Sequence, residues 1–449
     1  MAKKTYNLNN LVSFKVNNLK GSIVASPDKS ISHRSLLFAS LSVGLSRISN
    51  LLEADDVLRM IKALKRLGVK IRRNNKKEWL INGVGLVGFD TPAKEIDCGN
   101  SGTLARILIG ALANNNISVT LIGDNSLSNR PMDRVIFPLK KMGVEFLTLN
   151  NKLPITIKGK NNLIPIKYET PVSSAQIKTS ILLASLNTRG VTEVIEPYTS
   201  RNHSENLLKY FGADIKFDSV VKGKNKVFIK GGNSLKCRDV KVPGDISSAA
   251  FAIVAASIVS KSLVKIMNVG VNIFRTGILD ALKLMGANIL LENYRINEYD
   301  EPVSDIIVSY SKLKPIKLKN KFSAKMIDEY PILAMAAAAT NGKSIFCGLS
   351  ELKYKESDRF KAIMDGLNKC GIITVNKGDD LIIHGSKNKI EGGVSIDCKY
   401  DHRIAMSFLI LGTVSKKPIE VIGCKSILTS YPNFYEQMNF IGLDIRVKR

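Results

Sequence analysis

One short signature occurs six times along the chain. Each copy has two apolar residues three positions apart, then glycine and an aliphatic residue. Apolar residues at this spacing share one face of a helix, and glycine readily takes the left-handed conformation that ends one. The copies therefore predict six amphipathic helix ends, each followed by an extended segment. The glycines are Gly68, Gly143, Gly212, Gly286, Gly371 and Gly442.

The spacing of these glycines, about 70 to 85 residues, indicates one supersecondary unit used six times. This period is too long for a solenoid repeat and too short for six ordinary domains. We therefore expect an α/β array of two domains with three repeat units each. A polar, glycine-containing stretch followed by the turn Val242-Pro243-Gly244-Asp245 places the boundary near residue 240. The expected domains are residues 21–240, and residues 241–449 completed by residues 1–20.

The net charge of +27 would suit a nucleic-acid-binding protein. The lysines, however, are spread along the whole chain and mixed with asparagine, and no motif combines aromatic with basic side chains. Small anionic substrates account better for the excess of positive charge.

Membrane, secretory and metal-binding functions are not indicated. No run of about 18 uncharged apolar residues occurs, and no apolar signal-peptide core follows the first six residues. The six cysteines form no C-x-x-C pair, which is typical of reduced thiols in the cytosol. The four histidines show no metal-ligand spacing. We expect a cytoplasmic protein without a metal site.

Basic and small polar residues gather where loops are expected to enter helices. A helix N-terminus offers free N–H groups and a partial positive charge, so it binds anions. One such cluster is usually a solvated surface, but six clusters in both halves of the chain indicate anionic ligands. They span residues 26–34, 97–106, 129–134, 173–178, 355–359 and 401–403. Two acidic candidates, Asp328 and Glu356, accompany them.

These clusters resemble, in sequence and in order, the motifs of the 5-enolpyruvylshikimate-3-phosphate synthases, also called 3-phosphoshikimate 1-carboxyvinyltransferases. The matching stretches are Pro27-Asp28-Lys29-Ser30-Ile31-Ser32-His33-Arg34, Gly99-Asn100-Ser101-Gly102-Thr103, Asn129-Arg130-Pro131-Met132, Ser173-Ser174-Ala175-Gln176, Lys355-Glu356-Ser357-Asp358-Arg359 and Asp401-His402-Arg403-Ile404-Ala405-Met406. The resemblance implies the enolpyruvyl transferase fold, an inside-out α/β barrel. That fold has two domains of three βαβαββ units, two crossover strands, and an active site in the cleft between the domains.

The resemblance also implies a reaction. The enolpyruvyl (carboxyvinyl) group of phosphoenolpyruvate passes to the 5-hydroxyl of shikimate 3-phosphate, and phosphate leaves, by addition and then elimination without metal or organic cofactor. This transferase step belongs to the shikimate pathway to chorismate and the aromatic amino acids. The implied partners are these two small molecules, with no nucleic acid and no membrane, and we expect a monomer. Glyphosate is expected to occupy the phosphoenolpyruvate pocket beside Gly102.

By the same resemblance, each substrate has its own set of contacts. Both substrates carry a phosphate and a carboxylate, which fixed cations suit. Shikimate 3-phosphate is held by Lys29, Ser30, Arg34, Ser173, Ser174, Gln176, Arg201, Asp328 and Lys355. Phosphoenolpyruvate is held by Lys29, Asn100, Gly102, Arg130, Gln176, Arg359 and Arg403.

The implied catalytic residues are Asp328, Glu356 and Lys29. Asp328 is the base at the 5-hydroxyl, Glu356 is a candidate for proton transfer at the methyl carbon, and Lys29 touches both substrates. A carboxylate beside cations normally has a lowered pKa, which suits a base better than an acid. Which group handles each proton transfer stays open.

Two positions depart from the family pattern. Thr429 stands where many relatives carry a lysine, which puts one phosphoenolpyruvate contact in doubt. Glu351 stands where some relatives present an asparagine to the ring of the acceptor.

Two alternatives are open. A UDP-N-acetylglucosamine enolpyruvyl transferase shares the fold and the donor, but it carries Lys-Asn in place of Lys29-Ser30. It also usually has a reactive cysteine in a loop that here, at residues 124–129, has none. A non-catalytic scaffold would keep the repeats without needing six cationic clusters.

Overall fold

The computed structural model describes residues 8–221 and 224–448. The chain divides into two compact units. The N-terminal unit comprises Pro27–Val242 with Ile296–Glu301, and the C-terminal unit comprises Met1–Ser26, Pro243–Arg295 and Pro302–Arg449. Nothing in the sequence pattern indicated the short insertion Ile296–Glu301. Residues 1–7 of the segment expected to complete the second domain lie outside the described residues.

The N-terminal unit repeats one order of elements: a buried helix, a strand, an amphipathic helix and two further strands. The first repeat contains α1 (Lys29–Leu41), β3 (Ser42–Ser49), α2 (Asp55–Arg66), β4 (Lys70–Arg73) and β5 (Trp79–Val84). The second contains α3 (Gly102–Leu112), β7 (Ser118–Ile122), α5 (Asp133–Lys141), β8 (Glu145–Thr148) and β9 (Ile155–Lys158). The third contains α6 (Ala175–Ser185), β11 (Val191–Glu196), α7 (His203–Tyr210), β12 (Asp214–Val221) and β13 (Lys224–Lys230).

The C-terminal unit follows the same order. Its first repeat contains α8 (Ile246–Ile258), β16 (Leu263–Gly270), α9 (Gly277–Leu284), β17 (Asn288–Ile296) and β18 (Pro302–Ser309). The second contains α11 (Tyr330–Ala338), β20 (Gly342–Phe346), α12 (Arg359–Lys369), β21 (Ile373–Lys377) and β22 (Asp380–Gly385). The third contains α13 (His402–Gly412), β24 (Ile419–Ile422), α14 (Phe434–Phe440), β25 (Asp444–Val447) and, from the other end of the chain, β1 (Asn10–Phe14).

Shorter elements join the repeats. Edge strands are β2 (Lys20–Val24), β6 (Ile96–Asp97), β10 (Lys167–Glu169), β14 (Leu235–Lys236), β15 (Val240–Lys241), β19 (Lys317–Leu318) and β23 (Val394–Asp397). Short helices are α4 (Asn125–Ser128), η1 (Asn320–Phe322), α10 (Ser323–Met326), η2 (Ser350–Tyr354), η3 (Lys387–Lys389) and η4 (Cys424–Thr429).

Each repeat builds one small sheet. The sheets run β14-β3-β5-β4, β6-β7-β9-β8, β10-β11-β13-β12, β17-β18-β16-β2, β19-β20-β22-β21 and β23-β24-β1-β25. In each, an edge strand pairs in parallel with the strand that follows the buried helix. The N-terminal strand β1 lies antiparallel between β24 and β25, with Leu11 opposite Val421 and Val447.

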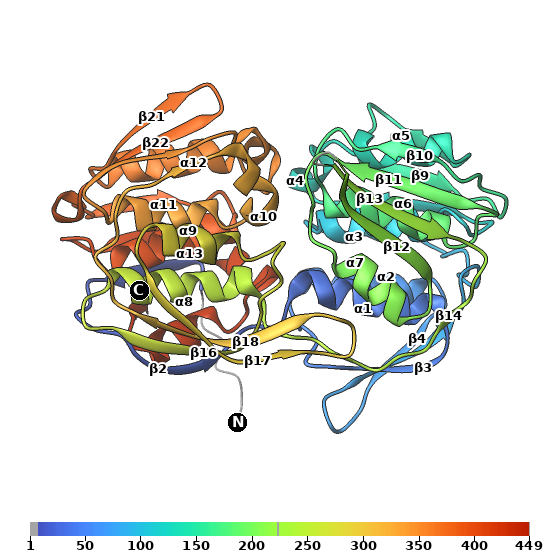
Figure 1. The fold of residues 1–449 in the computed structure, drawn as a ribbon, viewed down its shortest axis with the longest axis horizontal. Helices are drawn as coiled ribbons and strands as arrows, with labels where there is room; N and C mark the ends of the chain where they lie inside the picture. Colours follow the sequence, from blue (N-terminus) through green and yellow to red (C-terminus); the bar gives the residue numbers. More distant parts are fainter. Residues whose placement is uncertain (1–7, 222–223, 449) are drawn as a thin grey trace. The chain divides into compact units, whose positions relative to one another are not determined.

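Three almost wholly buried helices form the interior of each unit: α1, α3 and α6 in one, and α8, α11 and α13 in the other. In Figure 1 the strands of each unit lie outside these helices. Small residues allow close packing: a methyl group at Gly110 of α3 would lie 2.3 Å from the carbonyl oxygen of Ser180 in α6. Burial on nearly all sides is typical of helices in a protein core, although α1 and α6 also bury polar side chains, among them Arg34 and Lys178.

The six predicted helix ends are confirmed. Each signature glycine follows an amphipathic helix (α2, α5, α7, α9, α12 or α14) and has a φ between 84° and 107°. This left-handed region carries little strain only for glycine, which explains the recurring residue. Within the described ranges, no helix is long and apolar enough to cross a membrane.

Candidate active site

The predicted clusters lie at helix entrances, as expected. Helices α1, α3, α5, α6, α12 and α13 all begin within them. At α1, the Asp28 carboxylate caps the helix by accepting a hydrogen bond of 2.7 Å from Ile31 N. The first turn carries Lys29, whose Nζ lies 3.2 Å from the Asp56 carboxylate on α2. Asp56, which the sequence patterns did not single out, therefore fixes the position of Lys29.

Arg34 lies one turn further along α1 and is buried. Its guanidinium donates to Ser30 O at 3.0 Å, to Thr179 Oγ1 at 3.0 Å and to Ser204 Oγ at 2.7 Å. Arg34 thus joins α1, α6 and α7. Its predicted contact with shikimate 3-phosphate stays a prediction.

His33, beside Arg34, is fully buried, and neither ring nitrogen has a hydrogen-bond partner among the described residues. Burial, and then the charges of Lys29 and Arg34, lower the pKa of His33 to about 3. Since an unfolded histidine has a pKa near 6.5, the unfolded chain binds one more proton than the folded chain between these values. The stabilisation from a neutral His33 is complete above pH 6.5 and is lost as the pH falls toward 3.

Acidification should therefore destabilise the wild type more than a His33→Gln variant. Between pH 7.5 and pH 5 we expect the free energy of unfolding to fall by about 2 kcal/mol more in the wild type. Urea unfolding at the two pH values measures the difference. His384→Gln, at an exposed position, serves as the control and should keep the wild-type pH dependence. Equal pH dependence in the wild type and His33→Gln would refute this account.

The loop between β11 and α7 contacts two serines that are expected at shikimate 3-phosphate. Arg201 Nη1 donates to Ser30 Oγ at 2.9 Å, and Tyr198 N donates to Ser173 Oγ at 2.9 Å. The loop between β11 and α7 therefore reaches both α1 and the residues before α6. Ser174 lies at the N-cap of α6.

Arg130 lies against the loop before α3. Its Nη2 donates to Asn100 Oδ1 at 2.6 Å and to Ser126 Oγ at 3.1 Å. Asn100 Nδ2 in turn donates to Asp124 Oδ2 at 2.8 Å. The structure thus brings together Asn100 and Arg130, both expected at phosphoenolpyruvate.

Gln176 is oriented by two residues of α3. Arg106 Nη1 donates to Gln176 Oε1, and Gln176 Nε2 donates to Thr103 Oγ1, both at 2.9 Å. A methyl group on Gly102 would lie 2.7 Å from Arg106 Nη1 and 3.3 Å from Arg130 Nη1. Arg106 belongs to the predicted cluster 97–106 but was not among the predicted substrate-binding residues, although its position four residues after Gly102 places both on one helix face.

In the C-terminal unit, Arg359 opens α12 and is fully buried. Its Nε lies 2.8 Å from Asp401, its Nη1 3.2 Å from Asp328, and its Nη2 2.6 Å from Glu356. Burial opposes its charge, but Asp401, Glu356 and Asp328 together raise the pKa of Arg359 well above its ordinary value. One guanidinium therefore holds three carboxylates.

Asp328 accepts a second cation. Lys355 Nζ lies 3.0 Å from the same Oδ1 that Arg359 contacts, and the Asp328 side chain is 21% exposed. The proposed base is thus oriented by two cations while part of it stays accessible. The structure brings Asp328, Lys355, Glu356 and Arg359 together.

Arg403 opens α13 with its backbone N donating to Asp401 Oδ1 at 2.9 Å. Its Nη1 lies 3.9 Å from Glu329 Oε1, a buried carboxylate that also accepts from Ser247 Oγ. Burial raises the pKa of Glu329 against the opposing charges of Arg403 and Arg275. Asp401 and Glu329 position predicted substrate-binding arginines, but the sequence assigned neither a role.

The two departures from the family pattern lie in short helices of the C-terminal unit. Thr429 is the last residue of η4, and its Oγ1 donates a hydrogen bond of 2.7 Å to Ser426 O within the same short helix. Glu351 lies in η2, just before Lys355.

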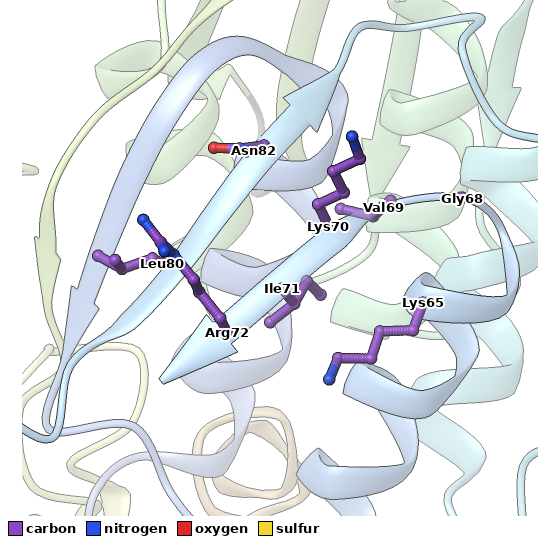
Figure 2. Close-up of a pocket in the computed structure, with 8 residues that line it drawn as sticks. All are labelled: Lys65, Gly68, Val69, Lys70, Ile71, Arg72, Leu80 and Asn82. Atoms are coloured by element: carbon purple, nitrogen blue, oxygen red, sulfur yellow. The ribbon is translucent and has the colours of Figure 1, made fainter. Parts of the chain in front are cut away.

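A separate pocket of about 680 Å³ lies in the N-terminal unit, where α2 ends and β4 and β5 follow. Figure 2 shows its lining residues, and none of them is a predicted site residue. Among the described residues, no group of three histidine, cysteine or acidic side chains could hold a metal ion.

Comparison with known proteins places this geometry in a family. The family model of EPSP synthase (3-phosphoshikimate 1-carboxyvinyltransferase) matches residues 14–438. The 3-phosphoshikimate 1-carboxyvinyltransferase of Paramagnetospirillum magneticum is 43% identical over 95% of this chain and 96% of its own. That of Sphingopyxis alaskensis is 45% identical over 93% of this chain and 94% of its own.

Solved structures of known proteins have the same fold as this chain. The EPSP synthase of Acinetobacter baumannii superimposes with a TM-score of 0.85 and 38% identity, covering 98% of this chain and all 100% of that chain. The enolpyruvyl transferase NikO of Streptomyces tendae gives a TM-score of 0.77 at 17% identity, covering 97% and 98%, which shows the fold alone. The predicted enolpyruvyl transferase fold is confirmed. The chain belongs to the EPSP synthase family, the 3-phosphoshikimate 1-carboxyvinyltransferases.

Proposed function

We infer that this enzyme transfers the enolpyruvyl group of phosphoenolpyruvate to the 5-hydroxyl of shikimate 3-phosphate with the residues described above. The observation that carries the assignment is the Asp328 carboxylate oxygen, held by both Lys355 Nζ and Arg359 Nη1. A partly exposed carboxylate kept in place by two cations suits a base that removes a hydroxyl proton. The matched family supports the acceptor over UDP-N-acetylglucosamine.

We propose that the N-terminal unit supplies most acceptor contacts. Lys29, Ser30, Ser173 and Arg201 offer the cations and hydroxyls that a phosphate ester and a carboxylate require. Ser174 and Gln176, at the start of α6, and the buried Arg34 complete the N-terminal set. From the C-terminal unit, Asp328 and Lys355 act at the 5-hydroxyl.

The donor contacts are proposed from both units. Asn100, Gly102, Arg130 and Gln176 meet phosphoenolpyruvate from the N-terminal unit together with Lys29. Arg359 and Arg403 meet it from the C-terminal unit.

The proposed chemistry has two steps. In the addition, Asp328 takes the proton of the 5-hydroxyl, the oxygen bonds to C2 of phosphoenolpyruvate, and C3 gains a proton. In the elimination, a proton leaves the new methyl group, the double bond re-forms and phosphate departs. Glu356 and Lys29 are the proposed groups for the proton transfers at carbon, and the charge that develops in both steps is stabilised by fixed cations.

Phosphate release tests the function. Purified enzyme should release phosphate from phosphoenolpyruvate with shikimate 3-phosphate, and not with UDP-N-acetylglucosamine or without an acceptor. Release with UDP-N-acetylglucosamine alone would refute the assignment, and no release with either acceptor would favour a scaffold. We further propose a cytoplasmic monomer, which sedimentation equilibrium and cell fractionation would check.

A further inference from the structure

A buried ion triad lies behind the first turn of α6. Lys178 Nζ is 2.7 Å from Glu196 Oε2 and 2.7 Å from Glu205 Oε1, and none of the three side chains is more than 1% exposed. A buried charge is costly unless it is paired and hydrogen-bonded. The three residues come from α6, β11 and α7, so the triad ties these elements together.

The three charges depend on one another. Burial opposes the charge on Lys178, but Glu196 and Glu205 raise its pKa. For Glu205, burial raises the pKa, and the positive charge of Lys178 opposes this effect. Removing the lysine would leave two buried carboxyl groups facing each other without a cation.

The triad continues into the loop between β11 and α7. Ser200 Oγ donates to Glu196 Oε1 at 2.6 Å, and Ser200 N donates to Glu196 Oε2 at 3.3 Å. The next residue, Arg201, donates to Ser30 Oγ. The glutamate that Lys178 neutralises is therefore the anchor of the residue before Arg201.

A second layer lies beside the triad. Thr179 follows Lys178 on α6, and Ser204 precedes Glu205 on α7. Both hydroxyls accept hydrogen bonds from Arg34, at 3.0 Å and 2.7 Å. The same seam between α6 and α7 thus carries the ion triad and a predicted acceptor-binding arginine.

We propose that Lys178 is a positioning residue for the acceptor substrate. By neutralising Glu196 and Glu205 it fixes the β11–α7 loop, so that Arg201 keeps its place beside Ser30 for the phosphate of shikimate 3-phosphate. This inference rests on the proposed function. No residue of the triad needs to touch a substrate.

The milder test is Ser200→Ala, which removes one hydrogen bond to Glu196 and leaves the triad paired. A hydrogen bond to a charged group stabilises the loop that carries Arg201. Its loss should therefore weaken the binding of shikimate 3-phosphate, and KM for this substrate should rise roughly 5- to 30-fold. KM for phosphoenolpyruvate and kcat should stay within about twofold, because their residues are not held by this loop. Steady-state phosphate release gives all three constants.

The stronger test is Lys178→Met, which approximates the apolar stem of the lysine side chain and removes the charged amino group. It should raise KM for shikimate 3-phosphate at least as much and lower the melting temperature. Lys160→Met is the matched control, because it breaks an exposed ion pair of 2.6 Å with Glu145 in the same unit. The Lys160→Met variant should keep the wild-type kcat and the wild-type KM for both substrates.

The outcomes separate the inference from the function. An inactive wild type would refute the proposed function. An active wild type with an unchanged KM for shikimate 3-phosphate in Ser200→Ala would refute the positioning role, even if Lys178→Met failed to fold. An equal rise in KM for shikimate 3-phosphate and for phosphoenolpyruvate would show that the triad has a purely structural role, and it would also refute the positioning role.

Discussion

Replacing Asp328 with asparagine should lower kcat by about 10²- to 10⁴-fold, the usual range for a general base. The Asp328 carboxylate already lies between Lys355 and Arg359, with contacts of 3.0 Å and 3.2 Å. The oxygen of an amide of the same shape can still accept both hydrogen bonds, but the amide cannot take the proton of the 5-hydroxyl. KM for shikimate 3-phosphate should therefore change far less than kcat. Steady-state phosphate release measures both constants.

Asp444→Asn is the matched control for this prediction. Asp444 pairs with Arg446 at 2.6 Å on the surface of the same unit, so its loss should leave kcat unchanged. If Asp328→Asn kept its turnover while losing shikimate 3-phosphate, Asp328 would be an anchor for the acceptor and not the base.

Glyphosate should inhibit the wild type in competition with phosphoenolpyruvate, and Gly102→Ala should relieve the inhibition. The added methyl group would lie 2.7 Å from Arg106 Nη1 and 3.3 Å from Arg130 Nη1. Both guanidinium groups must shift, and Arg106 also orients Gln176. A longer ligand tolerates such a change less well than the substrate. One methylene group discriminates by roughly 10- to 200-fold, and we expect a rise of that order in the half-inhibitory concentration.

Phosphate release at several phosphoenolpyruvate concentrations measures this effect. KM for phosphoenolpyruvate should rise less than the half-inhibitory concentration. Thr429→Lys is the comparison variant, since it alters a separate predicted contact and is not expected to relieve inhibition. A wild type that already resists high glyphosate would show that Gly102 alone does not set the tolerance of the pocket.

The fold could be predicted from the sequence because its signals are local. A glycine after an apolar pair marks a helix end wherever it occurs, and the six glycines all have the left-handed φ that the pattern requires. The entrances of α1 and α12 carry local signals too, since capping residues precede their basic residues.

The partners of the site residues could not be predicted in this way. Asp56 meets Lys29, and Glu329 meets Arg403, only because the fold brings distant segments together. Nothing local to Asp56 or Glu329 marks such a role. The sequence did not predict that the insertion Ile296–Glu301 belongs to the N-terminal unit. Its place there depends on tertiary contacts such as the one between His203 and Glu301.

The position of β1 in the last sheet has a consequence for synthesis in the cell. This strand is synthesised about 400 residues before its two neighbours, β24 and β25. At about 5 to 20 residues per second, it waits roughly 20 to 80 s for them. The C-terminal unit therefore cannot complete its last sheet until β24 and β25 have been made. During this interval the unpaired edges of β1 stay open to wrong pairing, which makes the wait for β24 and β25 a period of aggregation risk.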